Sequence, residues 1–169
     1  MSHGRHRVEA PASVRLCILT VSDTRTLDSD ESGRIIRELC EAAGHSIGDH
    51  RVVPDDPDRV REAIGAFLGR ADTQAVLVNG GTGISGRDRT YEAVAAMLEK
   101  RIDGFGELFR ALSFDAIGPA AMLSRAVAGT VSRRPVFCMP GSPAAVRLAM
   151  ERLILPEIGH AVAEAARPT

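Results

Sequence analysis

The chain is organised around residues 75–88, which read AVLVNGGTGISGRD. The apolar run at 75–78 predicts a buried strand, and a helical pattern from Thr90 places the glycines on a strand-to-helix turn. Clustered glycines allow backbone torsions closed to other residues, so successive N–H groups can point at an anion. Asp88 would hold a divalent cation that bridges phosphates, and Arg87 would neutralise spread charge. The stretch therefore predicts a site for metal-nucleotide chemistry.

Two other readings of the glycines have to be weighed. Residues 81–86 match the pattern G-x-G-x-x-G, which would make the chain a dinucleotide-dependent oxidoreductase. The context disagrees, because residues 87–89 intervene before the helix and residues 99–104 after it do not read as a strand. A Walker loop is excluded, since neither Gly-Lys-Ser nor Gly-Lys-Thr occurs in the sequence. From glycine spacing alone, a purely structural turn is a nearly equal alternative.

Length and composition bound the class of protein. A chain of 169 residues with no linker-like stretch predicts a single domain at 14–166 after a flexible tail at 1–13. Its formal net charge of −1 offers no global attraction to nucleic acid or to an anionic membrane. No apolar run is long enough to span a bilayer. Cys17, Cys40 and Cys138 lie in or beside apolar runs without C-x-x-C spacing, which indicates reduced thiols in a cytoplasmic protein.

The order of patterns along the chain predicts the fold class. Residues 14–21 are apolar at nearly every position, as in a strand buried on both faces of a sheet. Strand and helix patterns alternate three times up to residue 98, which predicts an α/β fold of three layers (αβα) with a mostly parallel sheet. Residues 126–131 and 135–139 flank a turn and predict a hairpin, hence one antiparallel strand at the edge. We expect Pro156 to kink or divide the last helix.

Polar side chains follow several of the predicted strands. Ser22 and Asp23 follow the first strand and Asp55 follows the second, at the sheet edge where α/β proteins gather ligands. A solvated loop explains Ser22 and Asp23 equally well, whereas Asp56 is explained as a helix cap. Residues 140–143 form a second strand-to-helix corner, which either holds another phosphate or only caps the helix.

The segment after the glycine loop departs from the alternating pattern. Residues 104–107 read GFGE and interrupt the helical spacing, which suggests an inserted active-site segment followed by one or two amphipathic turns. The apolar residues there leave room for an interface between copies of the chain; they are Leu108, Phe109, Leu112 and Phe114. Ser113 and Ser124 are explained on spacing alone as helix-surface positions.

Five segments in one order resemble the MoaB/MogA family of molybdenum cofactor biosynthesis proteins. They are residues 19–25 (LTVSDTR), 80–88 (GGTGISGRD), 104–107 (GFGE), 123–126 (LSRA) and 139–142 (MPGS). The resemblance extends from Val14 to about His160. It implies a compact α/β domain, commonly a trimer or a pair of trimers, that binds molybdopterin. Active members transfer AMP from Mg-ATP to the terminal phosphate of the pterin and release pyrophosphate.

The resemblance also assigns residues. Asp55 and Asp88 match two acids tied to catalysis, and we expect them to bind Mg²⁺ on the ATP phosphates. The matching ligand-binding positions are Ser22, Asp23, Gly80, Gly81, Thr82, Gly83, Arg87, Ser113, Ser124, Pro140, Gly141 and Ser142. Asn79, Cys138 and Ser142 differ from residues common in adenylyltransferase members, a combination that fits the MoaB branch.

Two functions follow from the resemblance. The retained Asp55 favours an enzyme that adenylylates molybdopterin with Mg-ATP. Cys138 favours the alternative, a protein of the same pathway that binds or carries molybdopterin without reacting it. A molybdenum-inserting enzyme is an expected partner in either case.

Overall fold

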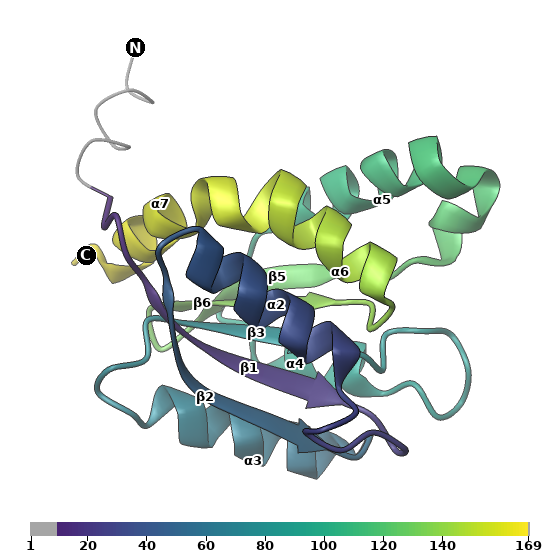
Figure 1. Cartoon of the computed structure of the whole chain (residues 1–169), viewed down its shortest axis with the longest axis horizontal. Coiled ribbons are helices and arrows are strands. Elements are labelled where there is room, and N and C mark those ends of the chain that lie inside the picture. Colours follow the sequence, from purple (N-terminus) through teal and green to yellow (C-terminus); the bar gives the residue numbers. More distant parts are fainter. Residues whose placement is uncertain (1–9, 169) are drawn as a thin grey trace.

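A computed structural model describes residues 10–168, and it confirms the three-layer α/β architecture (Figure 1). The sheet has six strands in the order β2-β1-β3-β6-β5-β4. Strands β2, β1, β3 and β6 run parallel, and β5 is antiparallel to both of its neighbours. Their bounds are β1 Arg15–Val21, β2 Ser46–Val53, β3 Ala75–Asn79, β4 Lys100–Arg101, β5 Val127–Val131 and β6 Arg134–Met139.

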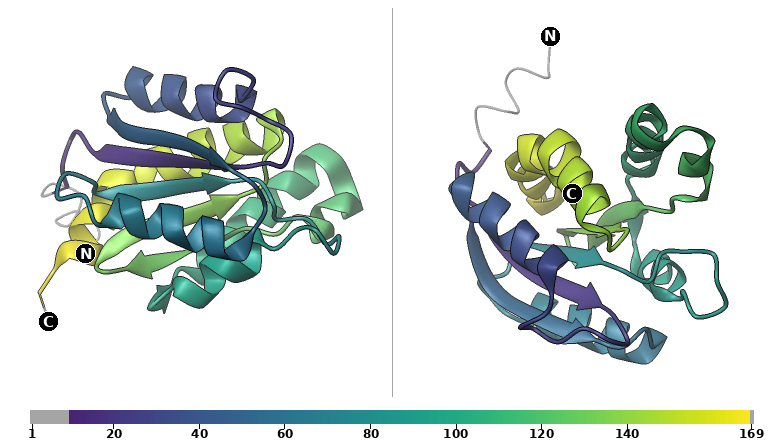
Figure 2. Two further views of the ribbon diagram at one scale, coloured as in Figure 1. Left: turned by 90° about the horizontal axis from the view of Figure 1, so that it is seen from below. Right: turned by 45° about the vertical axis from the view of Figure 1, so that its right-hand side comes forward.

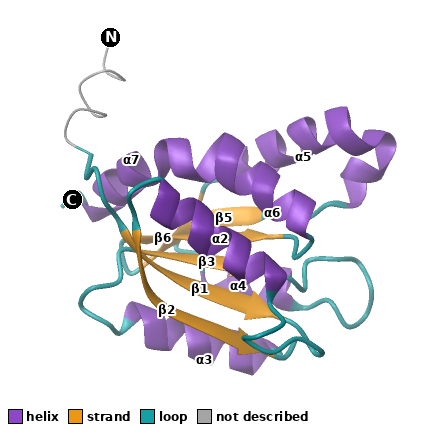
Figure 3. Cartoon of the chain, viewed as in Figure 1, coloured by secondary structure: helices purple, strands orange, loops and turns teal. Residues whose placement is uncertain are grey.

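Helices cover both faces of the sheet, as Figures 2 and 3 show from other directions and by element type. Two apolar clusters fill the spaces between the layers: α2, α5, α6 and α7 pack on one face, and α3 and α4 pack on the other. The helix bounds are α2 Glu31–Ala42, α3 Pro57–Leu68, α4 Thr90–Met97, α5 Asp103–Ile117, α6 Pro143–Ala149 and α7 Leu155–Ala166. Within residues 10–168, no helix combines the length and apolarity that crossing a membrane requires.

Strand β1 lies in the middle of this core. Its side chains alternate between the two clusters: Leu16 and Ile18 point to the α2 side, whereas Cys17 and Leu19 point to the α3 side. Because both faces are covered, nearly every position is apolar, which is the pattern predicted from residues 14–21. Of the tail expected at 1–13, residues 1–9 lie outside the described part of the chain.

The predicted helix starts and the predicted hairpin are confirmed. The Asp56 side chain accepts hydrogen bonds from the N–H groups of Asp58 and Arg59 at the start of α3, and Ser142 caps α6 with Pro143 in its first turn. Between β5 and β6, Ser132 and Arg133 have φ of 49° and 60°. Positive φ at both central residues is what a two-residue hairpin turn requires.

Two expectations about residues 99–117 are wrong. Lys100–Arg101 form the edge strand β4, so β5 is one strand in from the edge. Residues 104–107 do not break the helical pattern but belong to α5, which is 15 residues long. Glycine is required at 106 because a β-carbon there would lie 2.5 Å from the carbonyl oxygen of Ala126. The glycine that resembles a helix breaker is therefore what allows α5 to lie against β5.

The end of the chain follows the prediction for Pro156. A π-helical turn at Met150–Ile154 separates α6 from α7, and Pro156 stands in the first turn of α7. Proline has no N–H to donate and its ring crowds the preceding turn, so the wider turn relieves the clash without ending the helix.

Candidate functional site

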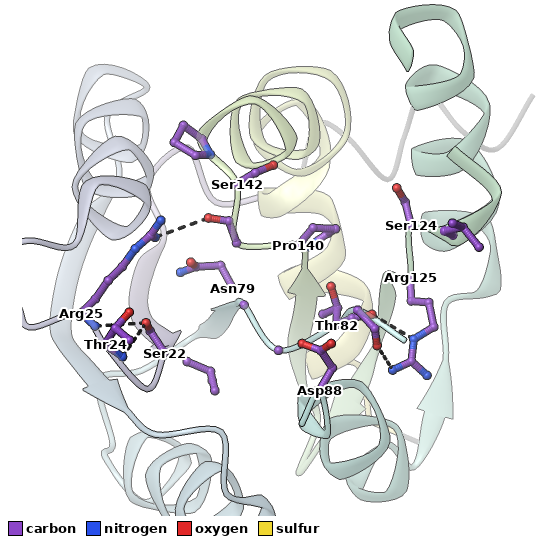
Figure 4. A pocket seen from close by; sticks show the side chains of 17 residues that line it. Ser22, Thr24, Arg25, Asn79, Thr82, Asp88, Ser124, Arg125, Pro140 and Ser142 are labelled. Atoms are coloured by element: carbon purple, nitrogen blue, oxygen red, sulfur yellow. Dashed lines mark hydrogen bonds between the residues drawn. The ribbon is translucent and has the colours of Figure 1, made fainter. Parts of the chain in front are cut away.

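Two adjoining pockets open at the carboxyl ends of β1, β2, β3 and β6, where the sequence predicts the ligand site. The larger, of about 640 Å³, is drawn in Figure 4. Its predicted members are Ser22, Gly80, Gly81, Thr82, Gly83, Asp88, Ser124, Pro140, Gly141 and Ser142. The second pocket, of about 510 Å³, adds Asp23, Asp55 and Arg87. Because Ser22, Gly81 and Asp88 line both pockets, the two are parts of one site.

The glycine loop forms the wall between these pockets. Gly80 and Gly81 have φ of 98° and 65°, so the chain turns through a conformation that favours glycine. The Gly80 N–H donates to the carbonyl of Met139 at 3.1 Å, which ties the loop to β6. In the described part of the chain, the N–H groups of residues 81–84 have no hydrogen-bond acceptor. Free consecutive amides beside a helix start are suited to binding an anion.

Asp55 lies against this loop on the α4 side. Its carboxylate accepts hydrogen bonds from the Arg89 N–H at 3.2 Å and from the Thr90 hydroxyl at 3.1 Å. Desolvation raises the pKa of Asp55, and the negative charges of Asp88 and Asp23 raise it further; the two hydrogen bonds oppose the shift without cancelling it. A cation between these acids would remove the repulsion.

Asp88 is fixed at the opposite end of the loop. It accepts hydrogen bonds from the Ser85 N–H at 3.0 Å and from the Ser85 hydroxyl at 2.6 Å. Residues 10–168 contain no group of three or more His, Cys, Asp or Glu side chains placed to hold a metal by themselves. Mg²⁺ on a nucleotide needs only one or two carboxylates, because phosphates and water complete its coordination. Asp55 and Asp88 therefore fit a magnesium ion that arrives with a nucleotide.

The turn before α6 closes the pocket beside the start of the glycine loop. The carbonyl of Gly141 accepts a hydrogen bond from the Ser32 hydroxyl at 2.6 Å and a longer one from Arg25 at 3.5 Å. A β-carbon on Gly141 would lie 2.9 Å from the Cα of Gly80, so the two turns touch through their glycines. Arg25 brings a positive charge to this end of the pocket (Figure 4).

A buried polar chain lies beneath that turn. The amide nitrogen of Asn79 donates to the Thr20 hydroxyl at 2.9 Å, Thr20 bonds to Asp30, and Asp30 bonds to the His50 ring at 2.8 Å. Burial alone would raise the pKa of Asp30, but hydrogen bonds from His50, Thr20 and the Gly33 N–H outweigh it and lower the pKa. The amide oxygen of Asn79 is buried without a partner, within the part of the chain that the structure describes.

Not every predicted site residue reaches the pocket. Ser113 lines neither pocket; it is buried in α5, where its hydroxyl donates to the Phe109 carbonyl at 2.7 Å. Cys138 is fully buried on the α3 side of the sheet and lines neither pocket, and burial raises its pKa to about 12. Conversely, Arg25 and Arg125 line the larger pocket although neither was expected as a binding residue. Both stand inside the quoted segments 19–25 and 123–126, which was the available signal.

A three-layer α/β domain with free loop N–H groups at the carboxyl ends of its parallel strands is of the class suited to phosphate-bearing ligands. Comparison with known families narrows it: the family described as "Probable molybdopterin binding domain" matches residues 17–160. The chain belongs to this family, in its MoaB branch, and acts in molybdenum cofactor biosynthesis.

Individual relatives resemble this chain in sequence and structure over nearly its whole length. Molybdenum cofactor biosynthesis protein B of Halalkalibacterium halodurans is 53% identical over 165 residues, which cover 97% of each chain. A crystal structure of a molybdenum cofactor biosynthesis protein B superposes with a TM-score of 0.91 at 52% identity, covering 95% of this chain and 100% of that one. The tungsten cofactor synthesizing protein MoaB from Pyrococcus furiosus superposes with a TM-score of 0.85 at 34% identity, covering 94% and 100%.

Proposed function

We propose that this protein is a molybdopterin adenylyltransferase, which uses Mg-ATP to attach AMP to the terminal phosphate of molybdopterin. The observation that carries the proposal is the placement of Asp55 and Asp88 in one site, on either side of a loop with free N–H groups. Two phosphate-bearing substrates repel each other, so a protein that joins them has to screen charge and hold both in line. The site offers donors for one anion and carboxylates for a metal that accompanies the other.

The two pockets differ in charge, and this difference supports an assignment of one substrate to each pocket. The larger pocket carries the Arg25 guanidinium beside the free amides, which suits the phosphate of the pterin. The second pocket gathers Asp23, Asp55 and Asp88, which suits a magnesium-bound triphosphate. Since Gly81 and Asp88 line both, the reacting phosphates would meet there.

The transfer itself asks little covalent chemistry of the side chains. An oxygen of the pterin phosphate forms a bond to the α-phosphorus of ATP, and the bond from that phosphorus to the bridging oxygen breaks, releasing pyrophosphate. A phosphate monoester is largely ionised at pH 7, so no general base is required. Magnesium, when bound to Asp55 and Asp88, would neutralise charge on the triphosphate. The N–H groups of residues 81–84 would orient the attacking phosphate. Arg87, which lines the second pocket, would screen the charge of the departing pyrophosphate.

The test is AMP transfer by the purified protein with molybdopterin and Mg-ATP, followed as adenylylated pterin and as released pyrophosphate. We expect both products in equal amounts, and neither when magnesium is chelated. A protein that binds molybdopterin but forms neither product would instead be a non-catalytic carrier of molybdopterin, which is the alternative function. Loss of pterin binding as well would refute both.

We also propose that the chain assembles as a trimer or a dimer of trimers and works in the cytoplasm. Large apolar side chains are exposed along the outer side of α5 and the 3₁₀ segment that follows it; they are Leu108, Phe114, Ile117, Met122 and Leu123. Large apolar side chains left exposed on two successive segments favour contact with another protein surface. Phe109, which the sequence also suggested for an interface, is buried in the core. Three buried, unpaired cysteines fit a reducing compartment.

A further inference from the structure

Arg125, between the 3₁₀ segment and β5, makes the most specific contact to the glycine loop. Its Nε donates to the Thr82 carbonyl at 2.9 Å, and its Nη2 donates to the Gly83 carbonyl at 2.7 Å. Both bonds have nearly ideal lengths and a charged donor, the kind that is roughly twice as strong as a neutral hydrogen bond. Figure 4 shows the guanidinium beside Thr82, on the far side of Asp88 from Ser22.

Because of the geometry of the peptide bond, this contact also sets the direction of the N–H groups proposed to bind the anion. In a planar trans peptide, the carbonyl of one residue and the N–H of the next point in opposite directions. By holding the carbonyls of Thr82 and Gly83, Arg125 directs the N–H groups of Gly83 and Ile84 away from itself. These two N–H groups belong to the run without an acceptor among the described residues.

Arg125 is itself held in place. Nη2 lies 3.3 Å from Oε2 of Glu92, Nη1 makes a short bond to the other carboxylate oxygen, and the guanidinium stacks over the Tyr91 ring at 4.6 Å. The bond to Glu92 raises the pKa of Arg125, and the same bond lowers the pKa of Glu92. Since Glu92 balances its charge, the distinctive contribution of Arg125 is the direction of its donors.

We propose that Arg125 is a positioning residue that orients the glycine loop for phosphate binding through its two bonds to the Thr82 and Gly83 carbonyls. The inference rests on the proposed role of this loop as the phosphate site. It predicts that a lysine at this position is a poor substitute, because an ammonium group keeps the charge but lacks the planar fork that reaches both carbonyls.

The experiment follows the backbone amides of residues 81–84 by ¹H–¹⁵N NMR during titration with inorganic phosphate. In the unmodified chain we expect these resonances to shift and saturate. In Arg125→Lys we expect altered positions of the Gly83 and Ile84 resonances before phosphate is added, and about tenfold weaker phosphate binding, as loss of one charge-assisted contact implies. The matched control is Arg101→Lys, because Arg101 bonds the same Tyr91 at 3.4 Å without reaching the loop. It should bind phosphate as the unmodified chain does.

A second variant separates orientation from general stability. Arg125→Ala should bind phosphate at least as weakly as the lysine variant, and added ethylguanidinium should restore part of the affinity by occupying the vacated place. Phosphate affinity unchanged in Arg125→Lys would overturn the inference, as would resonance changes spread evenly over the whole domain. The inference would also be overturned if, in the unmodified chain, the amide resonances of residues 81–84 did not shift when phosphate is added. Normal phosphate binding with no AMP transfer would refute the proposed function alone and leave the role of Arg125 intact.

Discussion

Gly83 faces Asp88 so closely that a β-carbon on Gly83 would lie 2.5 Å from Oδ2 of the Asp88 carboxylate. The same oxygen accepts both hydrogen bonds from Ser85, so it cannot move without giving them up. Because Gly83 has no side chain, the Asp88 carboxylate can lie directly beside the glycine loop. This contact joins the two parts of the proposed site, the phosphate-binding amides and the metal-binding carboxylates.

Gly83→Ala should therefore displace Asp88 while leaving the fold intact. The displaced group is the end of a side chain, so we expect the free energy of unfolding to fall by no more than about 1 kcal/mol, within the common range for single substitutions. AMP transfer should fall at least tenfold. The control is Gly86→Ala, because a β-carbon on Gly86 has no neighbouring atom within 4 Å. Equal activity in the two variants would show that the position of Asp88 does not matter.

Replacing the acids themselves should separate metal chemistry from pterin binding. In Asp55→Asn and in Asp88→Asn we expect AMP transfer to be abolished, because each amide is a poor ligand for Mg²⁺. Molybdopterin binding should be retained, since the loop amides do not depend on either charge. Asp28→Asn, on an exposed loop, is the control. Unchanged turnover in either site variant would remove that acid from the metal site.

The pKa of Asp55 predicts how magnesium-dependent nucleotide binding varies with pH. Only the ionised carboxylate binds the metal, so the affinity should rise with pH, with a midpoint above the ordinary Asp value of about 3.9. Because the folded state holds the proton more tightly than the unfolded chain, Asp55 lowers stability as pH rises through that window.

Thr90→Val tests the origin of this shift. It removes the hydroxyl that bonds Asp55, which is one of the contacts opposing the raised pKa, so the midpoint should move higher still. Magnesium-dependent ATP binding, measured by calorimetry across the acidic range, reports the midpoint. Thr73→Val is the matched control, since Thr73 is also buried but bonds Cys17 instead of Asp55. A midpoint that stays in place in Thr90→Val would contradict the assignment to Asp55.

The sequence predicts the parts of the fold that apolar patterns determine and misses those that depend on a partner. Strand β1 is recognisable because both of its faces are buried. Strand β4, by contrast, is the polar pair Lys100–Arg101, and it exists because it pairs with Gly129 and Thr130 on β5. Glycine at 129 has no side chain to keep the Lys100 carbonyl away. No pattern in the neighbouring sequence predicts that contact.

In the site, too, some residues are predictable from the sequence and others are not. Glycines and acids at strand ends identify the loop, Asp55 and Asp88, because parallel strands bring their carboxyl ends to one edge. Ser113 was expected in the site from the resemblance, yet its hydroxyl is satisfied within α5. The polar chain from Asn79 to His50 was missed altogether. It connects residues about 20 to 60 positions apart, which only the folded sheet brings together.

The exposed apolar surface on α5 predicts self-association. Phe114→Asp should shift the protein from a trimer or hexamer to a monomer, because a buried, unpaired charge at an interface is strongly unfavourable. The measurement is molar mass by light scattering during gel filtration. Leu27→Asp is a matched control: Leu27 and Phe114 are both 56% exposed, but Leu27 lies on the loop before α2. If Phe114→Asp keeps the original mass, the interface lies elsewhere.

The buried pair of Asp30 and His50 predicts a separate, pH-dependent contribution to stability. Asp30 caps α2, and its carboxylate is completely buried against the His50 ring. Asp30→Ala leaves the Gly33 N–H, the Thr20 hydroxyl and His50 without their shared acceptor. Leaving a buried donor without its acceptor costs about 1–3 kcal/mol, and we expect a loss near the upper end of that range in urea unfolding at pH 7. Asp56→Ala, which removes the equivalent but exposed cap of α3, should lose much less.

The sign of the pH dependence follows from the lowered pKa of Asp30. Between that lowered pKa and the ordinary value of about 3.9, the unfolded chain binds the proton more readily than the folded protein. The stabilisation by Asp30 is therefore complete above the ordinary value and disappears as pH falls through the folded pKa. The difference in unfolding free energy between the unmodified chain and Asp30→Ala should shrink over that acidic range. A difference that stays constant would mean that the contribution of Asp30 does not come from its ionised form.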